Sequence, residues 1–144
     1  MLKGRRVLVV GMGRSGVSAA QYAVSQGAHV RATDLNADAP QIPGAQHTYG
    51  KHIESEFTKA DLIIVSPGIP ASAPHLDLAR KAGVRVVSEL GFAAELIQQR
   101  GIPIIAVTGT NGKSSVTWFI GQLLEAAEVE LQRREGHQLL QPCA

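Results

Sequence analysis

The chain has 144 residues, a formal charge of +2 at neutral pH and a hydrophobic fraction of 44%, which suits one ordinary domain with a packed core. The small charge and the few aromatic side chains, 4% of the total, argue against nucleic acid as a partner. No apolar run approaches the roughly 18 residues of a membrane span, and the basic N-terminus is unlike a signal peptide, so a cytoplasmic protein without a membrane partner is expected. The single cysteine, Cys143, rules out an internal disulfide.

The first 34 residues predict a strand, a glycine turn, a helix and a second strand. The apolar run Val7–Val10 leads into Gly11–Gly16, which has the form G-x-G-x-x-G. Apolar residues at helical spacing follow and end at Gly27, and a second strand, His29–Thr33, precedes Asp34. This order is typical of a nucleotide-binding βαβ unit, in which the glycine turn approaches a phosphate and the acid lies at a sugar. The alternative is a glycine turn needed only for close helix packing.

The middle of the chain predicts further strands of a parallel sheet. Gln46–Tyr49 is a short candidate strand after a loop that contains two prolines, and Asp61–Val65 is a buried-type strand that ends in Ser66, Pro67 and Gly68. Ligands of open α/β sheets lie beyond the carboxyl ends of the strands, so this turn and the first glycine turn would line one crevice. A proline-stiffened turn without a ligand is the alternative. The next expected elements are a helix over 72–82, a strand over 84–87, and a helix with Ser88 as its N-cap that ends at Gln99.

A second glycine loop lies between the β-prone run Ile102–Val107 and an apolar pattern at helical spacing. Backbone N–H groups of such a loop, together with the positive end of the helix dipole, stabilise phosphate oxygens. Lys113 would add a mobile charge, and the hydroxyl of Ser114 is where such loops ligate magnesium. The match to the general P-loop formula is incomplete, because Val107 stands where that formula has its first glycine. The candidate residues for binding the phosphates of a nucleoside triphosphate are Gly109, Thr110, Asn111, Gly112, Lys113, Ser114 and Ser115.

Other polar residues predict no site. The five histidines lack the spacing of metal ligands, and the carboxylates Glu54 and Glu56 are interpreted as a solvated helix face. No serine, histidine and acid are arranged for nucleophilic catalysis.

The combination of the two glycine loops resembles the N-terminal region of the Mur ligase family. The resemblance covers residues 1 to about 127 and lies in three stretches, Val9–Gly16, Ser66–Ile69 and Val107–Ser115. Within the family the chain is most similar to the members that add D-glutamate to UDP-N-acetylmuramoyl-L-alanine. Ser115 stands where the family usually has threonine, which preserves the hydroxyl.

The resemblance implies a UDP-binding first domain and an ATP- and magnesium-binding central domain. Gly13, Arg14 and Ser15 would border the UDP diphosphate, Asp34 would meet the uracil end, and Ser66 to Gly68 would close the same crevice. Residues Gly109 to Ser115 would hold ATP, with Lys113 as the catalytic residue and Ser114 on Mg²⁺. In such ligases ATP phosphorylates the substrate carboxylate, and the amine of the amino acid attacks the resulting acyl phosphate.

The expected fold is therefore α/β, with a Rossmann-like parallel sheet covered by helices on both faces. The first strand, P-loop and helix of a second α/β ATPase domain would follow it. Residues 1–93 would be the UDP-binding domain, 94–127 the start of the ATP-binding domain, and 128–144 a divergent tail. The changed composition of the tail suggests a truncated or frame-shifted reading, with a natural short protein as the alternative. A monomer that is inactive alone is expected. Two alternatives stay open: an NAD-dependent oxidoreductase domain, for which Asp34 would bind a ribose hydroxyl, and a non-catalytic nucleotide-binding module.

Overall fold

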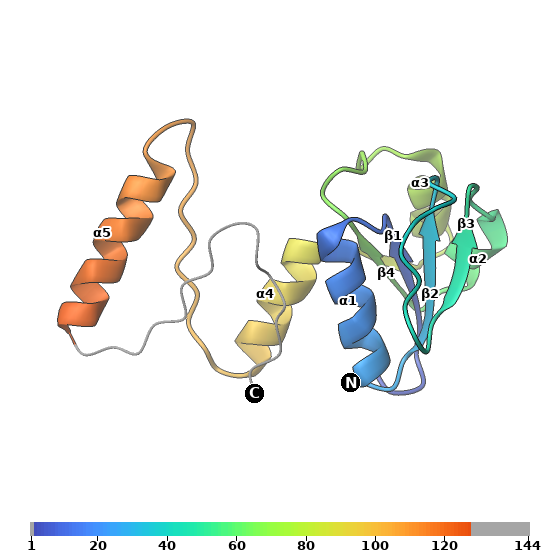
Figure 1. Cartoon of the computed structure of the whole chain (residues 1–144), viewed down its shortest axis with the longest axis horizontal. Coiled ribbons are helices and arrows are strands. Elements are labelled where there is room, and N and C mark those ends of the chain that lie inside the picture. Colours follow the sequence, from blue (N-terminus) through green and yellow to red (C-terminus); the bar gives the residue numbers. More distant parts are fainter. Residues whose placement is uncertain (1, 128–144) are drawn as a thin grey trace.

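The computed structural model describes residues 2–127, and in them five parallel strands form one sheet (Figure 1). The strands are β1 (Arg6–Val10), β2 (His29–Asp34), β3 (Gln46–Tyr49), β4 (Leu62–Val65) and β5 (Arg85–Ser88). Their order across the sheet is β3-β2-β1-β4-β5, so the chain runs outward from the centre and then returns to start again beside β1. The carboxyl ends of β1 and β4 therefore lie at the topological switch point, where open α/β sheets bind ligands.

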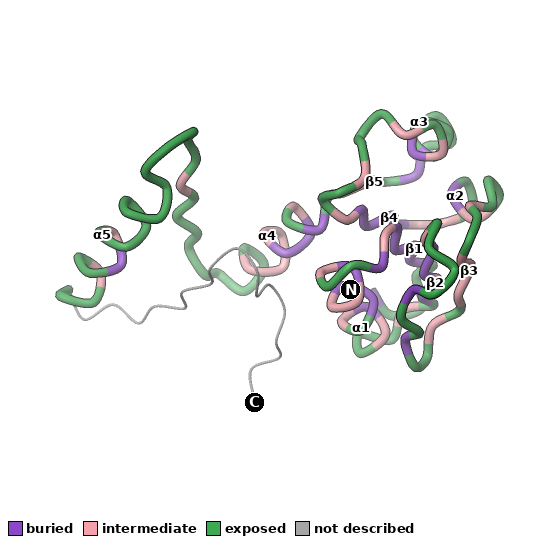
Figure 2. The backbone as a smooth tube through the Cα atoms, turned by 45° about the horizontal axis from the view of Figure 1, so that its top comes forward, coloured by how far each residue is buried: buried purple, intermediate pink, exposed green. Residues whose placement is uncertain are grey.

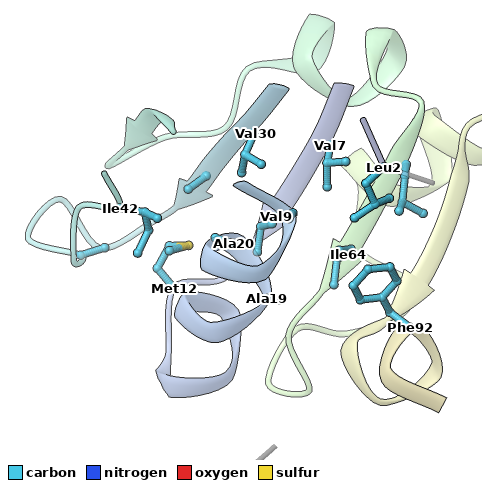
Figure 3. Packing of buried hydrophobic residues seen from close by; sticks show 14 residues of the cluster. Leu2, Val7, Val9, Met12, Ala19, Ala20, Val30, Ile42, Ile64 and Phe92 are labelled. Carbon is cyan, nitrogen blue, oxygen red and sulfur yellow. The ribbon is translucent and has the colours of Figure 1, made fainter. Parts of the chain in front are cut away.

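The central strand β1 is buried on both faces. Val7 and Val9 lie in one core together with the first helix and Phe92 (Figure 3), whereas Leu8 and Val10 lie in the opposite core. A strand covered on both faces needs apolar residues at successive positions, which explains why this run does not alternate with polar residues. Each fully buried side chain of this size stabilises the fold by about 1.5–3 kcal/mol.

Helices cover both faces of the sheet, as predicted. The described helices are α1 (Arg14–Ser25), α2 (Glu54–Lys59), α3 (Pro74–Lys81), α4 (Glu89–Gln99) and α5 (Lys113–Ala126). The first core is built with α1 and α4, and the second with α2 and α3. Among residues 2–127 no helix combines the length and the apolar character that crossing a membrane requires.

The five predicted strands of the first unit are confirmed to within one residue at each end. The helix predicted over 72–82 is shorter and begins at Pro74, whose fixed φ suits the first helical position. The predicted N-cap is confirmed, because the Ser88 hydroxyl oxygen accepts a hydrogen bond from the Gly91 backbone N–H at 3.0 Å. The division predicted between residues 93 and 94 falls inside α4 and stays a prediction.

The strand predicted over Ile102–Val107 is wrong for this structure, in which these residues have no regular secondary structure. A strand needs a neighbouring backbone for its hydrogen bonds, and the sheet ends at β5 without pairing to this segment. Residues 102–106 are exposed and Val107 is half-buried, and Ile105 is 61% exposed. The first strand of a second sheet is therefore not formed among the described residues.

The helix predicted after the second glycine loop is confirmed as α5, but it stands apart from the sheet in Figures 1 and 2. Most of its length is exposed (Figure 2), including Trp118 at 53%, Phe119 at 61% and Leu123 at 71%. Residues 128–144, for which a divergent tail was predicted, lie outside the described residues.

Candidate functional site

The glycine turn after β1 brings the start of α1 against the end of the strand. Gly11 has φ +89°, a conformation that favours glycine, and its N–H donates to the Thr33 carbonyl at 2.9 Å. A Cβ on Gly16 would lie 1.9 Å from the Gly11 carbonyl oxygen, so only glycine allows this approach. By contrast, a Cβ on Gly13 would have no atom within 4 Å. The turn is thus tightly packed at its base and open at its tip.

The open tip coincides with the N-terminus of α1, a helix of 12 residues. Its N-cap residue is Gly13, which offers no side-chain cap, and the first turn contains no acidic residue. The first N–H groups of a helix lack partners inside the helix and carry a partial positive charge. Arg14, at the first helical position, is exposed. This end of α1 is suited to an anionic group such as a phosphate.

Ser66, at the end of β4, joins the neighbouring loop to this turn. Its hydroxyl donates a hydrogen bond to the Gly11 carbonyl oxygen at 2.9 Å, and its backbone N–H donates to the Val10 carbonyl at 3.0 Å. The prediction that this turn and the first glycine turn come together is therefore correct in geometry. Gly68, where an added Cβ would meet nothing within 4 Å, faces open space.

Asp34, at the end of β2, is bonded to backbone on both of its carboxylate oxygens. Oδ2 accepts from the Met12 N–H at 2.5 Å and Oδ1 accepts from the Asn36 N–H at 2.8 Å. The carboxylate also contributes, after burial, to raising the pKa of Tyr49 above its ordinary value, and Tyr49 is its register partner on β3. Asp34 therefore lies beside the glycine turn, as the spacing predicted, with its charge directed at the backbone.

The second glycine loop forms at the N-terminus of α5. Gly112 is the N-cap in the left-handed conformation, with φ +76°, and the ammonium of Lys113 donates to the Gly109 carbonyl at 2.6 Å. Residues 108–115 are exposed, and Ser114 and Ser115 line an open hollow with Trp118 and Phe119. The loop has the shape of a phosphate cradle. Its glycine conformations, free helix end and nearby ammonium fit a nucleoside triphosphate, and an exposed Ser114 hydroxyl fits a magnesium ligand.

The structure thus brings one set of predicted residues together and leaves the other apart. Gly13, Arg14, Ser15, Asp34 and the turn over 66–68 surround the switch point of the sheet. The loop over 109–115 lies away from this crevice (Figures 1 and 2).

One sequence interpretation needs correction, because Glu56 is not on a solvated face. Its side chain is 6% exposed and forms an ion pair with Arg31, and it accepts a hydrogen bond from the Thr48 hydroxyl at 2.8 Å. The two glutamates are two positions apart and so lie on nearly opposite sides of α2. Glu54 is exposed, as interpreted.

Sequence reasoning also missed Glu89, which is 2% exposed and whose carboxylate oxygens have no hydrogen-bond partner among the described residues. It shares the buried face of α4 with Phe92 and Ala93, which are three and four positions later in the chain. This helical spacing from two apolar residues was the feature of the sequence that indicated its burial. Glu89 follows β5 directly, at the same edge of the sheet as Ser66.

No group of three or more histidine, cysteine or acidic residues in the part of the chain that the structure describes is placed to hold a metal ion. His52 instead contacts Thr33, with Nδ1 2.9 Å from the Thr33 hydroxyl. Burial, followed by the neighbouring His75, lowers the pKa of His52 below its ordinary value.

Comparison with known proteins gives a consistent answer. The family described as Mur ligase MurD-like, N-terminal domain, matches residues 5–88. The UDP-N-acetylmuramoylalanine--D-glutamate ligase of Chromobacterium violaceum is 41% identical over 133 residues, which cover 88% of this chain and 29% of that protein. The ligase of the same name from Anaeromyxobacter dehalogenans is 42% identical over 130 residues, covering 85% of this chain and 28% of that protein.

Solved structures share the fold at lower identity. A pseudomurein peptide ligase type C from Methanothermus fervidus has a TM-score of 0.57 and 23% identity, covering 86% of this chain and 26% of that one. A UDP-N-acetylmuramate-alanine ligase from Thermotoga maritima has a TM-score of 0.55 and 20% identity, covering 86% and 30%. The chain spans less than a third of the length of each of these relatives.

Proposed function

The chain belongs to the Mur ligase family through its MurD-like N-terminal domain, and from that premise we propose that it binds the nucleotide part of UDP-N-acetylmuramoyl-L-alanine. The corresponding activity is the ATP-dependent addition of D-glutamate in the synthesis of peptidoglycan precursors. In this reaction the muramoyl-alanine carboxylate is activated as an acyl phosphate, which the amino group of D-glutamate attacks. We expect the protein to act in the cytoplasm as a monomer.

The observation that carries the proposal is the uncapped N-terminus of α1 at the switch point of the sheet. Gly13, Arg14 and Ser15 would border the diphosphate, because they combine free N–H groups with a positive side chain. Asp34 would lie at the uracil end of the crevice, and the turn over Ser66, Pro67 and Gly68 would close its other side. These assignments agree with the resemblance of both turns to the same family.

The second loop would bind ATP and Mg²⁺. Residues Gly109, Thr110, Asn111, Gly112 and Ser115 would surround the phosphates, and Ser114 would ligate the metal. Lys113 would exchange its hydrogen bond with the Gly109 carbonyl for one with a phosphate oxygen. Its positive charge would then stabilise negative charge on the transferred group.

We further propose that residues 1–144 bind nucleotides without completing the reaction. The support is the exposure of residues 108–115 and the separation of α5 from the crevice (Figure 1). A phosphoryl transfer requires both substrates to be held in line at short range, and the described residues provide no such closure. D-glutamate-dependent release of phosphate from ATP by the purified chain would contradict this proposal.

Calorimetry with the purified chain tests the nucleotide assignment. We expect UDP-N-acetylmuramoyl-L-alanine and UDP to bind, and NAD to bind at least about ten-fold more weakly, a difference of about 1.4 kcal/mol. Gly13→Ala should weaken UDP binding, because a methyl group would enter the open tip where the diphosphate lies. Tight NAD binding without UDP binding would instead support an oxidoreductase domain.

Replacement of Lys113 by alanine tests the ATP assignment. The variant should lose ATP binding and keep UDP binding, because the two loops lie apart. In any complete ligase that contains this loop, the same replacement should abolish activity, whereas an intact activity would favour a module that only binds nucleotides.

A further inference from the structure

One peptide group of the glycine turn is held at both of its ends by side chains from neighbouring strands. The peptide that links Gly11 and Met12 carries the Gly11 carbonyl and the Met12 N–H. Ser66, following β4, donates to that carbonyl at 2.9 Å, and Asp34, ending β2, accepts from that N–H at 2.5 Å. β2 and β4 flank β1 on opposite sides, so the two hydrogen-bond partners lie on opposite sides of this peptide.

These two bonds fix the orientation of the peptide. In a trans peptide the C=O and the N–H point in opposite directions, and no cis peptide is present among the described residues. If the peptide turned over, its carbonyl would face the Asp34 carboxylate and its N–H would face Ser66. Two oxygens that both accept hydrogen bonds would then meet, so the side chains together favour one orientation only.

The orientation that they select is the one suited to an anion. The Gly11 carbonyl oxygen is directed beneath the first turn of α1, 1.9 Å from where a Cβ on Gly16 would stand. The partial negative charge of this carbonyl is therefore covered and hydrogen-bonded. The N–H groups at the start of α1, beyond Gly13, remain open.

Neither side chain is suited to direct contact with the diphosphate of a ligand. Each carboxylate oxygen of Asp34 already accepts a backbone N–H, from Met12 or from Asn36, and a carboxylate repels phosphate. Ser66 has one hydroxyl proton, which it gives to the Gly11 carbonyl, so it has none for a phosphate oxygen.

We propose that Asp34 and Ser66 are positioning residues that hold the Gly11–Met12 peptide in the orientation required for binding a nucleoside diphosphate. This inference rests on the proposed function, because it assumes that the turn receives the UDP diphosphate. It gives the two residues a role in the shape of the turn, in addition to the places in the crevice that the proposed function assigns to them.

The test uses the full 144-residue chain with the variants Asp34→Asn and Ser66→Ala. Asp38→Asn and Ser72→Ala, at exposed positions, are the matched controls. Hydrogen exchange of the Met12 amide, measured by NMR without ligand, reports on the peptide. NMR titrations with UDP and with uridine separate effects on the diphosphate from effects on the nucleoside, and urea unfolding confirms that each variant is folded.

We expect both variants to speed Met12 amide exchange and to weaken UDP binding. The loss should be about ten-fold in Asp34→Asn, which alters a hydrogen bond to a charged group, and about five-fold in Ser66→Ala, which removes a neutral hydrogen bond. In Ser66→Ala, uridine binding should change by less than about two-fold, because uridine lacks the diphosphate that the turn would hold. In Asp34→Asn, UDP binding should fall more than uridine binding, because the residue would also lie at the uracil end. Neither control should alter exchange or binding.

Equal weakening of UDP and uridine by Asp34→Asn would show that this residue acts on the nucleoside alone and would overturn the inference. Unchanged Met12 exchange and UDP affinity in Ser66→Ala would overturn it as well. If the unaltered chain binds no UDP, the proposed function fails, while faster Met12 exchange in both variants would still support the hold on the peptide.

Discussion

Replacing Gly16 with alanine tests the packing that shapes the crevice. The new Cβ would lie 1.9 Å from the Gly11 carbonyl oxygen and 2.9 Å from the Ser66 hydroxyl oxygen. Real Cβ contacts are essentially never below 3.0 Å, so α1 and the turn must separate by about 1 Å. Both contacted atoms belong to the same hydrogen bond. The substitution therefore strains the backbone and weakens the link between the two loops.

The expected cost has two parts. Overpacking of a rigid backbone contact costs about 1–3 kcal/mol, and loss of the Ser66–Gly11 hydrogen bond adds about 1 kcal/mol. A total of about 2–4 kcal/mol is a large share of the roughly 5–15 kcal/mol that holds a domain folded. For a chain of this size, Gly16→Ala should lower Tm by about 5–15 °C.

Gly13→Ala is the matched control, because it adds the same methyl group in the same turn. Gly13 has φ −67° and no atom within 4 Å of an added Cβ, so its stability should stay within about 0.5 kcal/mol of the original. Urea unfolding of the three proteins measures both differences. The packing argument is refuted if Gly16→Ala is as stable as Gly13→Ala, or if both lose stability equally.

Three ionisable groups give further predictions. The side-chain hydrogen bond from Arg6 lowers the pKa of Asp61 from 3.8 to about 2, so its stabilising effect is complete above 3.8 and is lost as the pH falls toward 2. The Tm difference between the original chain and Asp61→Asn should therefore shrink over that range. Burial lowers the pKa of His52 below 6.5, so the stability of the fold should fall as the pH drops below 6.5. Urea midpoints measured across that range should fall less steeply in His52→Gln. Glu89→Met should stabilise the fold by about 1–3 kcal/mol in urea unfolding, because the buried carboxylate has no partner among the described residues. A lower urea midpoint for Glu89→Met would show that this carboxylate does have a hydrogen-bond partner.

The parallel sheet was predictable because its signals are local. Leu62–Val65 is buried at every position, and a continuous apolar run of this length predicts a strand covered on both faces. The glycine turn was equally clear, since Gly11 and Gly16 satisfy steric needs that no other residue satisfies. The sequence thus predicted which residues come to the switch point.

The partners of polar side chains were not predictable in the same way. The spacing placed Asp34 at the end of β2, but its bond to Met12 depends on β2 lying beside β1 in the sheet. The burial of Glu56 likewise depends on Arg31, which is 25 residues away in the sequence. Such contacts follow from strand order, which local propensity does not encode.

The two glycine loops differ in how much of their structure a local sequence pattern determines. Each has a left-handed glycine, Gly11 or Gly112, and each is followed by a helix. The first is fixed by long-range bonds from β2 and β4, whereas the second is closed by Lys113 on the carbonyl of Gly109, four residues away. Turn chemistry alone therefore shapes the second loop, the proposed phosphate cradle, without a sheet. The first loop differs because neighbouring strands hold it from both sides, and this hold is what we propose orients it toward a ligand.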